Sequence, residues 1–378
     1  MAKTKKRNSE IYSLKQVLLT SLSKKHELAR VLFGYKNIGE YKYLNQAITE
    51  LSKTAPIFEY LVYGTLLPRN FSDLGKCKIA FIKPISVENE IKWTLNQIHK
   101  CKAYLEDMIK IKTDVETCII LGQYEDALRN LERMQNKYGV SMWLIEMNIL
   151  IYYRKYDINK VVEYVSKINT EQKGLKSGFV SYLTYFLYKK CNPKISAYEF
   201  DTELENEAKR NSSTFSVDRF NYFKFRLNFL DVINTIDYTP VLLMESTNSI
   251  LDRYESLVNV LRALFVTDKL DKDLIVTYAK KLYNLSNDER LQVFLAYANE
   301  APASYFDKEF VEVLDLYYTG YYQECIVSSK LYLQHHPQSF DIIKIYCRSL
   351  LFQRKGFSCI TSEDSILNSI SDKVYKVL

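Results

Sequence analysis

Apolar residues recur along the first part of the chain at the three- and four-residue spacing of an α-helix. Within residues 9–67, for example, Ile11, Leu14 and Leu18 fall on one helical face. Similar spacing returns through most of the remaining chain, whereas the apolar–polar alternation typical of a strand occurs at residues 77–82. The pattern therefore predicts an all-α protein with a short extended segment near residues 77–82.

Interruptions of the helical pattern divide the chain into four expected regions. These are an N-terminal helical region (1–70), a helical-repeat region (71–190), a polar interruption (191–216) and a C-terminal helical-repeat region (217–378).

Two local signals predict helix boundaries in the C-terminal region. The tripeptide Tyr238-Thr-Pro is expected to break a helix, because proline cannot donate a backbone hydrogen bond. The run Ser286-Asn-Asp-Glu has the spacing of a capping pattern, so a helix is expected to begin at Asn287.

A glycine followed two residues later by a tyrosine separates two helical runs at two places. The first is Gly122-Gln-Tyr-Glu-Asp-Ala, and the second is Gly320-Tyr-Tyr-Gln-Glu-Cys. Glycine allows a tight turn between antiparallel helices, and the small residue five positions later, Ala127 or Cys325, lets their backbones approach. Each segment therefore predicts a helical hairpin.

Both segments resemble the second half of a tetratricopeptide repeat, and a fainter copy covers residues 153–162. Tyr124 and Tyr156 lie 32 positions apart, close to the family period of about 34 residues. The resemblance implies an α-solenoid of antiparallel helix pairs, whose extended wall would bind a protein or peptide partner.

The amino-acid composition is consistent with this architecture and indicates the cellular compartment of the protein. The chain of 378 residues contains only 10 Gly and 7 Pro, too few for a protein rich in tight β-turns. Seven widely spaced cysteines are typical of reduced thiols rather than a disulfide framework. With no signal-peptide pattern and no apolar run of spanning length, we expect a cytoplasmic protein. The abundance of Lys, Ile, Asn and Tyr suggests a bacterium or a mobile element as the source.

Sequence motifs for catalysis or cofactor binding are missing. Neither GxxxxGK[ST] nor GxGxxG occurs, and there is no HExxH and no serine in a GxSxG context. Adjacent His335 and His336 would point about 100° apart on a helix, so we interpret them as terminal residues rather than metal ligands. We therefore expect no cofactor, no metal and no catalytic residue, and favour a non-enzymatic protein over a helical enzyme.

Tyrosines and a basic N-terminus are the candidate contact residues. Tyr317 and Tyr321 flank the second glycine turn, and tyrosine is enriched among residues that dominate interfaces. The net charge is +7, and the first ten residues hold four basic residues and one acidic residue. The basic residues are candidates for contact with nucleic acid or an acidic partner, although a solvated terminus is the simpler interpretation. They are Lys3, Lys5, Lys6 and Arg7.

The preferred functional hypothesis is a scaffold or adaptor that binds a partner protein or peptide through its helical-repeat surface. The alternative is a bacterial regulator or phage-defence component that senses a peptide or contacts nucleic acid. Fold alone does not choose between them, because function depends on the site.

Overall fold

The computed structural model describes most of the chain. Described are residues 2–21, 25–75, 85–172, 179–192, 194–195, 197–210, 217–227, 237–267, 269–299, 308–337, 339, 342–343, 345–346 and 349–350. The extended segment expected near residues 77–82 lies outside these ranges.

Within the described ranges, the secondary structure consists of eighteen α-helices and one short 3-10 helix, without a strand. The all-α prediction is confirmed. The helices are α1 (Ala2–Ser21), α2 (Lys25–Ile38), α3 (Lys42–Ser52), α4 (Ile57–Tyr63), α5 (Val87–Lys100), α6 (Lys102–Ile120), α7 (Tyr124–Tyr138), α8 (Met142–Lys155), α9 (Ile158–Gln172), α10 (Phe179–Cys191), α11 (Ala197–Arg210), α12 (Val217–Arg226), α13 (Tyr238–Glu245), α14 (Ile250–Thr267), α15 (Lys272–Ser286), α16 (Glu289–Ala298), α17 (Lys308–Thr319) and α18 (Tyr322–His335), with the 3-10 helix at Phe71–Asp73.

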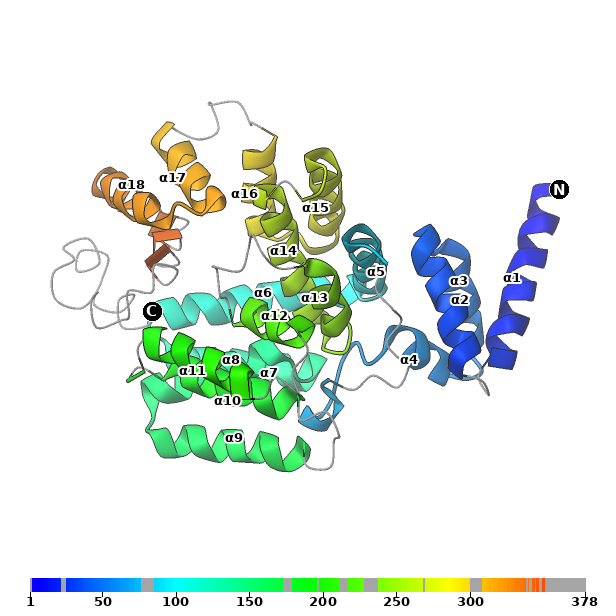
Figure 1. The fold of residues 1–378 in the computed structure, drawn as a ribbon, viewed down its shortest axis with the longest axis horizontal. Coiled ribbons are helices and arrows are strands. Elements are labelled where there is room, and N and C mark those ends of the chain that lie inside the picture. Colours follow the sequence, from blue (N-terminus) through cyan, green and yellow to red (C-terminus); the bar gives the residue numbers. More distant parts are fainter. Residues whose placement is uncertain are drawn as a thin grey trace.

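Helices that follow one another in the sequence pack side by side, as in a helical-repeat solenoid. The pairs α6–α7, α8–α9, α15–α16 and α17–α18 are examples. The array also folds back, because α13 and α14 pack on α5, and α15 packs on both α5 and α6. Figure 1 shows α5 between the N-terminal helices α1–α3 and the pair α14–α15.

The two predicted glycine turns have the same backbone geometry. Gly122 and Gly320 adopt φ values of 69° and 86°, in the left-handed region that favours glycine. In each turn the N–H of the residue after glycine donates to the carbonyl five positions back, at 2.8 Å from Gln123 and 2.9 Å from Tyr321. The glycine N–H donates three positions back, which completes a Schellman motif.

The fainter third hairpin turns differently. Between α8 and α9 the chain bends at Tyr156, which has φ −112° and a side chain exposed to solvent. Asp157 then accepts a hydrogen bond of 3.1 Å from the N–H of Lys160. This turn therefore lacks the glycine geometry that the other two hairpins share.

Two predicted boundaries were wrong. α13 begins at Tyr238, where a helix break was expected, because Asp237 caps it and Pro240 falls in the first turn, where a missing N–H costs nothing. α16 begins at Glu289 rather than Asn287, since Asp288 is the capping residue. Ser286 instead closes α15.

Apolar side chains gather in three clusters. The largest draws residues from α5 to the segment after α18, so it joins helices far apart in the sequence. A second cluster combines residues of the 3-10 helix segment with residues from Val140 to Leu227. A third cluster contains residues of α1–α5. No helix in the described ranges combines the length and the apolar character needed to cross a membrane.

Ala127 lies on α7 with no exposed surface, in the hairpin that α7 forms with α6. We expect Ala127→Phe to overpack this contact and lower the free energy of unfolding by about 1–3 kcal/mol. Urea denaturation measures the change. Ala103→Phe is the matched control, because Ala103 is exposed on α6. Equal stability of the two variants would mean that Ala127 is not at a close helix contact.

Candidate functional site

The start of α14 is unusually rich in buried polar residues. Within residues 247–256, which cover the first turns of α14 and the three residues before it, seven polar side chains are at most 9% exposed. A buried polar group is costly unless it is hydrogen-bonded or charge-paired, and all of these side chains except the hydroxyl of Ser256 have such a partner in the described structure. They are Thr247, Asn248, Ser249, Asp252, Arg253, Glu255 and Ser256.

Asp252 joins α14 to the N-terminus of α8. Its carboxylate accepts hydrogen bonds from the backbone N–H groups of Met142 at 2.9 Å and Trp143 at 3.0 Å. These groups open a helix and have no partner within it. The carboxylate also accepts from Ser249 Oγ at 2.7 Å and from Arg226 at 2.5 Å. Asp252 therefore supplies α8 with a capping group from another helix.

Arg253 joins the same helix to the loop that follows α4. The guanidinium has no exposed surface and donates to the carbonyl oxygens of Tyr63 at 2.8 Å and Asn248 at 3.0 Å. The backbone N–H of Ile250 donates to Leu66 at 2.8 Å. These bonds hold the loop against α14.

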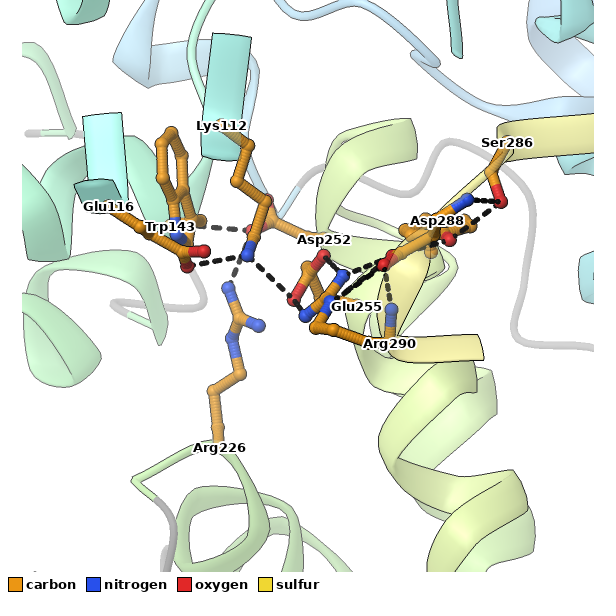
Figure 2. A network of polar contacts seen from close by, with 10 residues as sticks. Lys112, Glu116, Trp143, Arg226, Asp252, Glu255, Ser286, Asp288 and Arg290 are labelled. Atoms are coloured by element: carbon orange, nitrogen blue, oxygen red, sulfur yellow. Dashed lines mark hydrogen bonds and ion pairs between the residues drawn. The ribbon is translucent and has the colours of Figure 1, made fainter. Parts of the chain in front are cut away.

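Glu255 leads into a network of alternating charges, shown in Figure 2. Arg290 donates two hydrogen bonds to Glu255, at 2.7 and 2.9 Å, and a further bond of 2.6 Å to Asp288. Lys112 on α6 lies 3.5 Å from Glu255 and 2.5 Å from Glu116. The network connects α6, α14 and the start of α16.

The charged groups in this network shift one another's pKa. Burial raises the pKa of Asp288, but the charge and hydrogen bonds of Arg290, with a hydrogen bond from Tyr254, lower it to a net value of about 2. Burial opposes ionisation of Glu255 as well, yet Arg290 and Lys112 hold its pKa below the ordinary value. Both carboxylates are therefore ionised at neutral pH, which fixes the Arg290 side chain between them.

A cleft of about 310 Å³ borders the network, with walls from α6, α14, α16 and α17 and from the α15–α16 turn. Its apolar surface includes Phe294 and Tyr318, whose ring centroids are 5.7 Å apart. Eight charged residues line the cleft, five acidic and three basic, so the lining has a net negative charge. They are Glu106, Asp114, Glu116, Asp288, Glu289, Lys110, Arg262 and Arg290.

The two tyrosines predicted as anchors lie in different environments. Tyr317 lines the cleft, is 3% exposed and accepts a hydrogen bond of 3.0 Å from Arg262, whose guanidinium also stacks on its ring. Tyr321 is 61% exposed at the start of α18 and is not part of the cleft lining. The structure thus places one of the two in the cleft.

The basic residues of the N-terminus belong to α1, because this helix begins at Ala2. The side chains of Lys3, Lys5, Lys6 and Arg7 lie outside the described part of the structure. No side-chain contact therefore tests their predicted role.

The described cysteines and histidines do not form a reactive or metal-binding cluster. Burial raises the pKa of the Cys101 thiol to about 11 and that of Cys191 to about 12, so both thiols stay protonated at neutral pH. In the described ranges no group of three His, Cys, Asp or Glu side chains could hold a metal ion. His336 stacks on Tyr332 at the end of α18, with ring centroids 4.5 Å apart.

No sequence motif indicated the charge network. Asp252, Glu255 and Arg290 occur in segments that alternate apolar and charged residues, as a solvated helix does. The helical pattern offered no warning, because Ile250, Leu251, Tyr254 and Leu257 fall on one face of α14 and the charged residues fall on the other, as in a helix at a protein surface.

Comparison with known proteins adds one relative. The chain is 22% identical over 321 residues to the protein named Detocs histidine-protein kinase DtcA of Enterobacter cloacae (strain JD6301). The match covers 84% of this chain but 28% of the relative. No protein-family model and no solved structure matches the chain, so the tetratricopeptide resemblance stays a prediction.

We expect Asp252→Asn to lower the free energy of unfolding by about 3 kcal/mol or more. The substitution keeps the size of the side chain but removes the buried carboxylate charge that pairs with Arg226 and accepts the N–H bonds of α8, while Glu245 remains as a second buried acidic neighbour of Arg226. Chemical denaturation measures the loss. Asp218→Asn is the control, since Asp218 is exposed on α12 and should change stability by only about 0.5 kcal/mol. A loss no larger than the control's would show that the Asp252 charge is dispensable.

The low pKa of Asp288 predicts a pH-dependent contribution to stability. Its folded pKa of about 2 lies below the ordinary 3.8, so the unfolded chain takes up the proton first as pH falls. The stabilisation is complete above about pH 5, at roughly 2 kcal/mol, and about half is lost by pH 3. Denaturation of the parent and Asp288→Asn at pH 7 and pH 3 measures this. An unchanged difference between them would contradict the assignment.

Proposed function

We propose that the chain is a non-enzymatic binding module that takes up a segment of a partner protein in the cleft between α6, α14, α16 and α17. The observation that carries the proposal is the construction of this cleft. Asp288 and Arg290 in its wall are held by each other and by Glu255, so the wall is fixed before a ligand arrives. A preorganised site loses less conformational entropy on binding.

The composition of the cleft favours a peptide with a basic side chain. Glu116, Asp288 and Arg290 of the lining are in ion pairs, and Glu106 and Arg262 are hydrogen-bonded to Asn287 and Tyr317. Asp114, Glu289 and Lys110 make neither contact in the described part of the structure. Two free carboxylates against one free lysine, in a cleft that also contains the rings of Phe294 and Tyr318, suit a ligand that combines a cation with apolar groups. The volume of about 310 Å³ is sufficient for one or two side chains.

The similarity to a histidine-protein kinase favours a role in signalling. The chain corresponds to 28% of that protein, and we propose that the matched region recognises a ligand in both. In this interpretation the chain is a bacterial, cytoplasmic regulator or adaptor, and the kinase activity of the relative belongs to its remaining part.

Selection from a displayed library of random peptides tests the proposal. The full chain is expected to enrich peptides that contain Lys or Arg and bind with a Kd on the order of micromolar. Asp114→Asn combined with Glu289→Gln should weaken the selected peptides about tenfold, because both free carboxylates are lost. Asp218→Asn combined with Glu132→Gln removes the same charge from exposed positions outside the cleft and should leave binding unchanged.

Two further variants separate the cleft from the other candidate contacts. Tyr321→Ala removes the exposed tyrosine, and Lys5→Gln with Lys6→Gln removes charge from α1. Peptide binding that depends on either variant but not on the cleft carboxylates would contradict the proposed site. Failure to enrich any peptide would contradict the proposed function itself.

A further inference from the structure

A second hollow, separate from the cleft, lies where α5 meets the N-terminal helices on one side and α15 on the other. This groove has a volume of about 450 Å³. Figure 1 shows the three elements that frame it, with α5 between α3 and α15. Its lining contains no acidic residue among the described side chains and has four that carry or can carry positive charge: Lys42, Lys92, His99 and Lys281.

Hydrogen bonds between the helices hold the groove in shape. Asn45 on α3 donates to Asn96 on α5 at 2.6 Å, which joins the two helices across the floor. Tyr278 on α15 donates to Glu88 on α5 at 2.9 Å, and Lys92 lies 2.7 Å from the same carboxylate. The groove is therefore a built feature, with both sides tied to α5.

The positive charge in the groove is only partly neutralised. Lys92 is balanced by Glu88, but Lys42 and Lys281 have no acidic partner within the described residues. Lys281 lies over the ring of Tyr278, with its ammonium 5.5 Å from the centroid. Two lysines from different helices thus leave uncompensated charge at one hollow, which attracts an anion.

Two further features add hydrogen-bond donors. α3 begins at this groove, and its N-cap residue Tyr41 gives the helix no side-chain cap, so the first N–H groups of the helix lack that partner. Tyr41 lines the groove and is 8% exposed, and its buried hydroxyl has no hydrogen-bond partner in the described structure. Asn284 adds an exposed amide on the opposite side.

From this arrangement we propose that the groove binds a nucleoside phosphate. Lys42, Lys281 and the start of α3 hold the phosphates, while the amide of Asn284 and the one N–H of Asn96 that is not bonded to Asn45 bind the base edge. The volume of the groove lies in the range of small-ligand sites. Lys42 and Lys281 line the same groove and do not form an extended row of positive charge along the surface. This geometry favours a mononucleotide over a nucleic-acid strand.

Isothermal titration calorimetry of the full chain with ATP, AMP, adenosine, inorganic phosphate and a single-stranded oligonucleotide tests this inference. ATP is expected to bind with a Kd on the order of 10–100 µM, more tightly than AMP, and adenosine is expected not to bind. The double variant Lys42→Glu with Lys281→Glu should weaken ATP at least about tenfold. The matched control is Lys167→Glu with Lys209→Glu, two exposed lysines outside the groove, and it should leave ATP binding within about twofold. Thermal melts confirm that both variants fold.

Each other outcome overturns the inference. Absence of ATP binding at about 1 mM rules out a nucleotide site of this affinity. Equal affinity for ATP and inorganic phosphate shows that the base is not recognised, and equal affinity of the two double variants places any binding outside the groove. Tight binding of the oligonucleotide without binding of ATP would assign the groove to nucleic acid instead. None of these results bears on the peptide selection at the cleft, because the two sites share no lining residue.

Discussion

The burial of consecutive polar residues at the start of α14 is the constraint on which the rest of the structure depends. Asp252 reaches α8, Arg253 reaches the loop after α4, Tyr254 donates to Asp288 at 2.8 Å, and Glu255 binds Arg290. Because the side chains leave the helix in different directions, one turn of α14 contacts three other parts of the chain. Each buried group needs its partner, so these parts cannot move independently without a large loss of free energy.

The same constraint explains why the cleft has a fixed wall. An arginine at a protein surface usually samples many rotamers, but Arg290 is held by the carboxylates of Glu255 and Asp288. The acidic partners keep their charge at neutral pH because Arg290 lowers their pKa. The interaction that stabilises the junction of α14 with α16 therefore also orders the surface that we propose for peptide binding.

The two proposed sites lie along one helix. α15 supplies Tyr278 and Lys281 to the groove, and its last residue, Ser286, belongs to the cleft lining. α15 packs on α5 and α6, which border the groove and the cleft respectively. α15 therefore contributes residues to the walls of both sites.

The sequence by itself determined the helical class, the glycine turns at Gly122 and Gly320, and the burial of Ala127. These features depend on residues within a few positions of one another, so periodicity and local conformational preference are sufficient to predict them. Only the tertiary structure decided that Asp252 is a buried cap rather than a solvated charge. Its partner N–H groups lie 109 and 110 positions away. The spacing of residues in one helix does not report which distant helix will cover it.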